Sequence, residues 1–148
     1  MHEIRIDRSK RLCQEPQYGH NRYHPDLDAV LEVSEGDEVV IETRDALDGQ
    51  ITPDSTEADL ASLDGRAIHP LTGPVYVKGA QPGDALEIEF LEIEPQPTAF
   101  SAIVPGLGFL RDKMTTPFVV HWKIAHGSAT SHGTLQIGLW SLFGSTSW

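Results

Sequence analysis

Hydrophobic and polar residues alternate with a period of two through much of this chain. The alternation, or a short run of β-branched residues, occurs at residues 3–6, 29–33, 38–44, 74–79, 85–93, 118–124 and 134–140. Successive side chains of a strand point to opposite faces, so this period predicts strands with one face in a core. Turn sequences rich in Gly, Pro and Asp separate the segments. The pattern predicts a mainly β fold, a β-sandwich or barrel-like domain of about seven short strands.

Residues 53–65, PDSTEADLASLDG, depart from this period and predict one short helix. Ser55 or Thr56 can cap its start, and Gly65 can close its end. Leu60 and Leu63 are three positions apart, a spacing that suits packing against a sheet.

Two segments share one short pattern, SEGDEVVIE at 34–42 and QPGDALEIE at 81–89. In each, Gly supplies a positive φ and Asp follows at the exit of the turn. Asp37 and Asp84 are therefore interpreted as turn residues that bond their own backbone. Both segments predict a turn that leads directly into a strand.

The chain has 148 residues, enough for a single β-rich domain, 1–148, with a core of its own. Its formal net charge is −11 and no basic cluster is present, so we expect no nucleic-acid partner. No apolar run approaches the roughly 18 residues of a membrane span, and the first residues lack the apolar core of a signal peptide. Cys13 is the only cysteine, which fits a cytoplasmic protein without internal disulfides.

Histidines offer the first candidates for chemistry. His20 and His24 are four positions apart, a spacing that on a helix would present both to a metal ion. Gly19, Asn21 and Pro25 oppose a helix there, so a looped segment is the stronger interpretation.

Three later histidines have plainer interpretations. His121 alternates with apolar residues in a predicted strand and is expected to be structural or at the surface. His126 and His132 fall in a Gly/Ser/Thr-rich turn, where we expect them to be exposed.

His69 lies in a more favourable context. It precedes Pro70, which favours an extended backbone at His69. A rigid loop braced by proline holds a histidine well for metal ligation or proton transfer, although a structural role stays open.

Acidic residues cluster where the predicted strand 38–44 ends. Asp45, Asp48 and Gln50 surround Gly49. Carboxylates that leave a strand end can bind a metal or act as a general base. They can equally form a turn that bonds its own backbone, and the sequence leaves both open.

Four segments in this order resemble a known family: GHNRYHPD (19–26), VLEVSEGDEVVIETRDALDGQ (30–50), HPLTGPVYVKGAQPGD (69–84) and VPGLGFLRD (104–112). Together they resemble the N-terminal half of the acetamidase/formamidase family, from about residue 18 to about residue 144. The resemblance implies a β-rich hydrolase that cleaves the C–N bond of small linear amides such as formamide or acetamide. Ammonia would be released, and a divalent metal, Zn²⁺ or similar, would take part.

The resemblance also implies site residues. Those matching catalytic positions, which would also be the metal ligands, are His20, Asp45 and His69. Weaker candidates are Gln50 and Thr72, which would bind substrate, and Asp48. The family often has Trp in place of Tyr23 and Gly in place of Asp48, which makes the assignments around Gly49 less secure.

The resemblance implies a chain of about half the family's length, without a Gly/His/Asp-rich stretch of the second half. Two hypotheses follow: an amidohydrolase that binds a small amide substrate, or a catalytically inert half-length β-domain that serves as a ligand-binding or assembly subunit. A half-length chain would expose surface that the second half covers, which favours a homo-oligomer.

Overall fold

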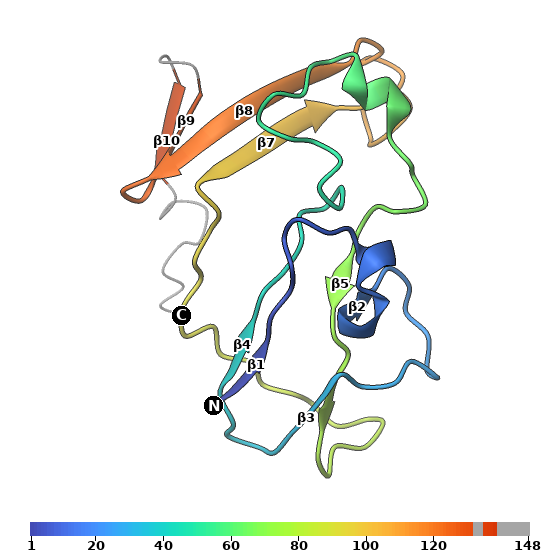
Figure 1. Cartoon of the computed structure of the whole chain (residues 1–148), viewed down its shortest axis with the longest axis vertical. Coiled ribbons are helices and arrows are strands. Elements are labelled where there is room, and N and C mark those ends of the chain that lie inside the picture. Colours follow the sequence, from blue (N-terminus) through green and yellow to red (C-terminus); the bar gives the residue numbers. More distant parts are fainter. Residues whose placement is uncertain (132–134, 139–148) are drawn as a thin grey trace. The chain divides into compact units, whose positions relative to one another are not determined.

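The structure, a computed structural model, describes residues 1–131 and 135–138 (Figure 1). The regular secondary structure of the described residues is mainly strands in small sheets, which confirms the mainly β fold class. Their helical turns are short 3₁₀ segments, η1 (Leu12–Gln14), η2 (Pro16–Tyr18) and η3 (Asp59–Ser62). No helix in this part of the chain is long and apolar enough to cross a membrane.

Packing separates the chain into two compact units, and each is described by itself. The first comprises residues 1–50 and 63–88, and the second comprises residues 51–62 and residues from 89 onward. The single domain proposed for 1–148 stays a prediction.

Three two-stranded pairs build the first unit. They are β1 (His2–Ile4) parallel to β4 (Val39–Ile41), β3 (Leu31–Val33) parallel to β6 (Val75–Val77), and β2 (Gly19–His20) antiparallel to β5 (Leu71–Thr72). Four of these strands lie in or overlap predicted segments, and their Val and Ile residues suit a pleated, half-buried surface. Ile4 and Val33 are buried and form the apolar core of this unit. β2 and β5 have two residues each, too few for an alternation of apolar and polar residues to be recognised in the sequence.

One antiparallel sheet of four described strands dominates the second unit, in the order β10-β9-β8-β7. The strands are β7 (Thr98–Ile103), β8 (Phe118–Ala125), β9 (Ser128–Ser131) and β10 (Leu135–Gly138). β7 and β8, the two long arrows in Figure 1, pair from Thr98 opposite Lys123 to Ile103 opposite Phe118. β8 and β10 confirm the strands predicted at 118–124 and, for its described residues, at 134–140.

The β8–β9 hairpin corrects the long turn expected around His126. His126 and Gly127 have φ values of 51° and 71°, which suit a two-residue hairpin turn. The chain therefore re-enters the sheet at Ser128, along a Ser/Thr-rich strand that has no apolar alternation. His132 lies outside the described residues.

The predicted helix at 53–65 shortens to η3. The carboxylate of Asp59 accepts the Thr56 N–H at 2.7 Å, and the Ser55 hydroxyl accepts the Thr52 N–H at 3.0 Å. These side-chain bonds build tight turns that compete with a regular helix. The helical turn η3 ends at Ser62, so Gly65 does not close a helix. Leu60 is buried, as expected of a residue that packs against a sheet. The Nε2 of His121 lies 2.7 Å from the Ser55 carbonyl oxygen. That contact gives His121 the structural role expected of it.

The two repeated turns are both present. Asp37 donates its N–H to the Ser34 carbonyl at 3.1 Å, while its carboxylate accepts the Ser34 N–H at 2.7 Å. Asp84 makes the same two bonds with Gln81, at 3.0 and 2.8 Å. The turn interpretation of Asp37 and Asp84 is therefore confirmed.

The strand predicted at 85–93 is wrong, although the turn before it is correct. Residues 85–97 form no strand, and every residue from 81 to 98 is exposed. A strand needs a neighbour that accepts its backbone hydrogen bonds, and no other described segment pairs with this one.

Candidate active site

His20 is positioned by the β2–β5 pair of the first unit, where it lies opposite Leu71. The approach is close because Gly19 has no side chain, and a Cβ at Gly19 would collide with the Leu71 carbonyl oxygen. The Nδ1 atom of His20 is buried and has no hydrogen-bond partner among the described residues. The imidazole faces the Tyr23 ring edge-on at a centroid distance of 6.2 Å. An unpartnered buried nitrogen is costly, which makes His20 a candidate for binding a ligand.

His69 comes two residues before Leu71, at the same end of this strand pair. Its backbone N–H donates to the Ala46 carbonyl at 2.8 Å, and its φ is 57°. This left-handed backbone corrects the extended one expected before Pro70, because the bond to Ala46 turns the chain at His69. The imidazole is exposed and makes no hydrogen bond within the described part of the chain. A non-glycine residue held in this region of φ is uncommon and concentrates at functional sites.

Asp45 stands beside Ala46, but its carboxylate holds its own turn. One oxygen accepts the Leu47 N–H at 2.9 Å, and the other accepts the Gly49 N–H at 2.7 Å. Its carbonyl also accepts the Asp48 N–H at 3.0 Å. This geometry is the self-bonded turn that the sequence left open beside a metal or base role. Each oxygen keeps one lone pair for a further partner.

Gln50 and Thr72 support the neighbouring backbone. The Gln50 amide pairs with Asp64, accepting the Asp64 N–H at 2.7 Å and donating to its carbonyl at 3.3 Å. The Thr72 hydroxyl donates to the Glu42 carbonyl at 2.7 Å, which ties β5 to the end of β4. Their role in binding substrate stays a prediction, because these side-chain groups are engaged within the fold.

Glu42 carries a strongly stabilised charge beside this frame. Its carboxylate accepts the Ile6 backbone N–H at 3.0 Å and pairs with Arg5 at 3.1 Å and Arg8 at 3.3 Å. The Ile6 hydrogen bond, aided by the two guanidinium groups, holds the pKa of Glu42 below its ordinary value of 4.5.

Asp48 belongs to a buried ion network that the sequence did not reveal. Its carboxylate accepts the Leu12 N–H at 2.9 and 3.0 Å, and lies 3.8 Å from the Arg44 Nε. Arg44 also donates to the buried Glu15 at 2.7 Å. Asp48 has a φ of 55°, in the left-handed region that Gly adopts more easily than other residues. The i, i+4 spacing of Arg44 and Asp48 is the only sequence signal of the network.

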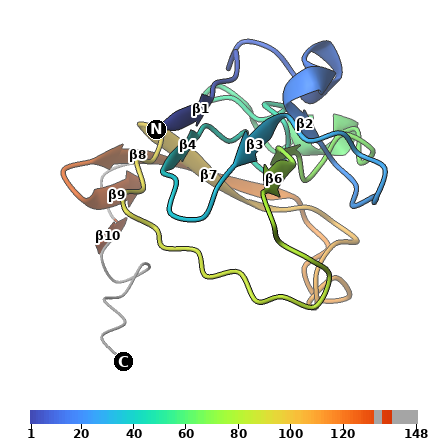
Figure 2. The same ribbon diagram turned by 90° about the horizontal axis from the view of Figure 1, so that it is seen from below.

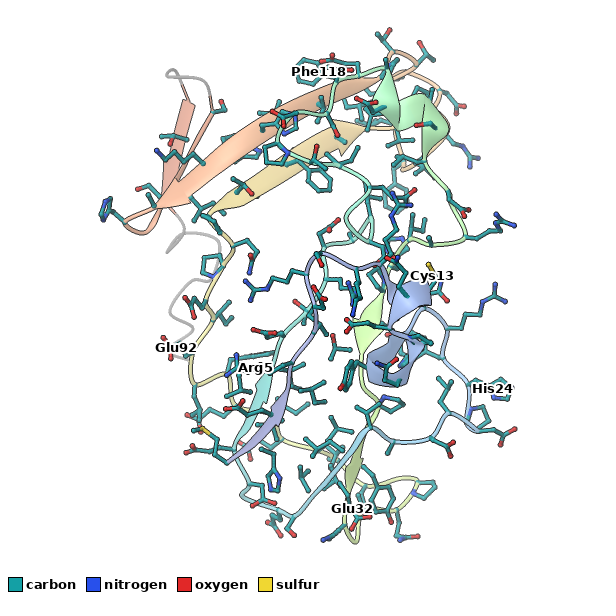
Figure 3. All side chains as sticks on the ribbon, viewed as in Figure 1. Arg5, Cys13, His24, Glu32, Glu92 and Phe118 are labelled. Carbon is teal, nitrogen blue, oxygen red and sulfur yellow. The ribbon has the colours of Figure 1, made fainter. Side chains whose placement is uncertain are left out.

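Three segments therefore meet at one end of the β2–β5 pair. They carry His20, His69 and, through Ala46, the turn of Asp45. Within the described residues, no three His, Cys, Asp or Glu side chains are arranged to hold a metal ion. His24 points outward from its loop (Figure 3) and pairs with Asp26 at 3.8 Å, so it does not join His20 in a metal-binding pair.

A model of the acetamidase/formamidase family matches residues 5–141. The chain belongs to the acetamidase/formamidase family. The acetamidase of Mycolicibacterium smegmatis is 34% identical over 139 residues, which cover 85% of this chain and 34% of that protein. The formamidase of Methylophilus methylotrophus is 31% identical over 134 residues, covering 86% of this chain and 33% of that protein.

Solved structures share the fold, among them an acetamidase from Bacillus halodurans with a TM-score of 0.70 and 30% identity, which covers 82% of this chain and 39% of its own. A gamma lactamase from Delftia acidovorans matches 93% of this chain and 36% of its own, with a TM-score of 0.85 and 28% identity. This chain spans about a third of the length of the curated relatives that it matches. The resemblance implied a larger share, about half.

Proposed function

We propose that this chain is an amidohydrolase that cleaves the C–N bond of small linear amides of the formamide and acetamide type. Membership of the acetamidase/formamidase family supports amide hydrolysis, and favours it over the catalytically inert alternative. The products would be a carboxylate and ammonia. A cytoplasmic location and a homo-oligomer stay predictions.

The observation that carries the site is the hydrogen bond from the His69 N–H to Ala46. It fixes the backbone of His69 beside the turn of Asp45, at the end of the strand pair that holds His20. An exposed histidine on a fixed backbone, whose imidazole makes no hydrogen bond in the described part of the chain, suits proton transfer near neutral pH. In the proposed reaction, His69 takes a proton from the attacking water and returns it to the departing amide nitrogen. His20 would orient the substrate through its unpartnered Nδ1, and Asp45 would hold the turn.

The participation of a metal ion stays a prediction, for which the described residues offer no binding site. Within the described residues, no three His, Cys, Asp or Glu side chains, His20, Asp45 and His69 included, are arranged to hold a metal ion. These residues as arranged do not fit a divalent ion, so no step of the proposed reaction runs through one. Metal analysis of the purified chain tests the prediction directly.

The test is ammonia release from formamide and acetamide, with and without added Zn²⁺ or Mn²⁺. His69→Asn removes the proton-accepting side chain, and Asn tolerates a left-handed backbone. His126→Asn is the matched control, because His126 is also exposed and has a φ of 51°. We expect His69→Asn to lose about 100-fold or more in kcat and His126→Asn to retain the parent rate.

Two results would reject the proposal. A chain that releases no ammonia from either amide under any of these conditions is not an amidohydrolase by itself. Equal rates for the parent and His69→Asn would remove His69 from the reaction. Melting temperatures of both variants should match the parent, which separates a chemical effect from a structural one.

The gamma lactamase neighbour supports a second candidate substrate, a small cyclic amide. Hydrolysis of a lactam breaks the ring C–N bond, so the amine stays attached to the product and no ammonia is released. Chromatography of a γ-lactam and its amino-acid product therefore distinguishes this candidate from the linear amides. Turnover of the lactam with no ammonia from linear amides would reassign the substrate.

A further inference from the structure

Two residues with a left-handed backbone frame the turn at residues 45–49, defined here as the site turn. Asp48 has a φ of 55° and His69 has a φ of 57°. The other non-glycine residue of this kind in the described part of the chain, His126, lies in the β8–β9 hairpin. The Ala46 carbonyl connects the first two, because it accepts the His69 N–H at 2.8 Å. A non-glycine residue keeps a left-handed backbone only where its surroundings over-determine it.

The bonds within the site turn shape it but do not place it in the unit. The Asp45 carboxylate accepts N–H groups of the turn itself. Asp48 instead reaches the N-terminal segment, residues 7–15, where its two carboxylate oxygens accept the Leu12 N–H at 2.9 and 3.0 Å. Among the described residues, no other side chain of the site turn bonds a distant segment. Figure 2 shows the N-terminal segment as the blue trace that runs from β1 to the helical turns η1 and η2.

The bond between Asp48 and Leu12 is buried. The Asp48 side chain is 1% exposed. Leu12 is the first residue of η1, and the first N–H groups of a helical turn have no acceptor within it. Loss of the carboxylate would leave this N–H without its partner, which costs more in a buried place than at the surface.

Arg44 reinforces the same connection. Its guanidinium donates to the Glu15 carboxylate at 2.7 Å and lies 3.8 Å from the Asp48 carboxylate. It also donates to the backbone carbonyls of Asp7 and Lys10. One guanidinium thus holds carbonyls and a carboxylate of the N-terminal segment next to the carboxylate of the site turn.

We propose that Asp48 is a positioning residue, whose carboxylate anchors the site turn to the N-terminal segment, so that Ala46 holds the backbone of His69 in place. The effect on rate rests on the reaction proposed above, in which His69 transfers the proton. A misplacement of about 1 Å can cost about 100-fold in rate. Loss of the anchor should therefore lower kcat and leave KM nearly unchanged.

Two variants break the anchoring bond from opposite sides. Asp48→Gly removes the carboxylate, and Gly adopts a left-handed φ readily. Leu12→Pro removes the N–H, and proline suits the first position of a helical turn. Arg11 before it has the extended backbone that a following proline requires, with a φ of −86° and a ψ of 163°. Asp48→Asn is the conservative variant, because its side-chain oxygen can still accept the Leu12 N–H and Asn tolerates a left-handed φ.

Hydrogen exchange of the His69 amide measures the anchoring without any need for activity. This amide is bonded to Ala46 and exchanges when that bond opens. The reference is the Lys78 amide of the same unit, which donates to the Val33 carbonyl at 2.8 Å. The ratio of the two exchange rates separates a local opening at His69 from unfolding of the whole unit.

We expect Asp48→Gly and Leu12→Pro each to raise this ratio by roughly tenfold or more. The double variant should raise it no further, because both changes remove one bond. Asp48→Asn should stay within about threefold of the parent. Ile4→Ala is the control for a general loss of stability, because Ile4 is 3% exposed in the core of the same unit, and it should leave the ratio unchanged.

Kinetics with formamide test the consequence for the reaction. Asp48→Gly should lower kcat about tenfold or more with KM within about twofold, and Asp48→Asn should recover most of the lost rate. An unchanged exchange ratio in Asp48→Gly, or an equal rise in Ile4→Ala, would overturn the proposal. So would an active parent whose kcat Asp48→Gly retains. If Asp48→Gly fails to fold, Leu12→Pro decides by the same ratio. A raised ratio in a parent and variants that release no ammonia would support the anchor and reject the amidohydrolase instead.

Discussion

Removal of Arg44 should destabilise the first unit more than loss of any exposed ion pair. The Arg44 side chain is only 8% exposed and contacts two buried carboxylates, Glu15 at 2.7 Å and Asp48 at 3.8 Å. It also donates to the Asp7 and Lys10 carbonyls, which fastens the N-terminal segment to the turn at 45–49. Arg44→Met keeps much of the apolar stem and deletes the charge.

The expected cost follows from what the two carboxylates would then lack. Breaking a buried ion pair from one side costs about 3–5 kcal/mol, because the remaining charge is desolvated without compensation. Lys10 stays 3.9 Å from Glu15, and the Leu12 N–H stays bonded to Asp48, so part of the compensation survives. We therefore expect a loss near the lower end, about 3 kcal/mol. That is a large share of the roughly 5–15 kcal/mol by which domains are stable.

Urea unfolding followed by far-ultraviolet circular dichroism measures this loss. With a slope of about 1.5 kcal/mol per molar, 3 kcal/mol lowers the midpoint by about 2 M. Arg66→Met is the matched control, because Arg66 is 87% exposed although it lies 3.0 Å from Asp64. Exposed pairs contribute about 0–1 kcal/mol, so its midpoint should barely move. The reasoning is refuted if Arg44→Met and Arg66→Met shift the midpoint equally.

Two further predictions address the frame around the site. The lowered pKa of Glu42 contributes stability above the ordinary value of 4.5, and this is lost as the pH falls through the lowered folded value. Glu42→Gln should therefore flatten the fall of melting temperature with acid, and an unchanged profile would contradict it. Gly19→Ala should cost about 1–3 kcal/mol, because its Cβ meets the Leu71 carbonyl oxygen. Gly65→Ala, where a Cβ meets nothing within 4 Å, should leave the urea midpoint nearly unchanged, and equal effects would contradict the steric argument.

Local patterns predicted β1, β3, β4, β6, β8 and β10, all of which have a neighbouring strand within the described chain, but they missed β2, β5, β7 and β9. The apolar alternation at 29–33 and 38–44 corresponds to β3 and β4, each of which has a strand beside it. Turn chemistry was the most transferable signal, because Gly36 and Asp37 need only their own backbone to form their bonds. The helix at 53–65 failed for the same reason, since its Ser, Thr and Asp side chains formed local turns instead.

The sequence could predict which segments carry the candidate residues, but not how those residues are oriented and bonded. Matching the family identified His20, Asp45 and His69, and the fold brings their segments to one end of β2–β5. No spacing in the sequence could show that Asp45 bonds its own turn, or that the Nδ1 of His20 has no hydrogen-bond partner among the described residues. The left-handed φ of His69 depends on a hydrogen bond to Ala46, more than twenty positions earlier. Such long-range bonds are invisible to a local pattern.

Residues 85–93 show what a hydrophobic pattern does and does not encode. Residues 34–42 and 81–89 have the same turn and the same alternation, yet only the first is followed by a strand. The difference lies outside both segments: β1 supplies a neighbour to one, and no described segment supplies a neighbour to the other. Alternation reports which surface a chain can bury, whereas strand formation requires a second backbone. The alternation at residues 85–93 is therefore compatible with a strand, but among the described residues it has no second backbone to pair with.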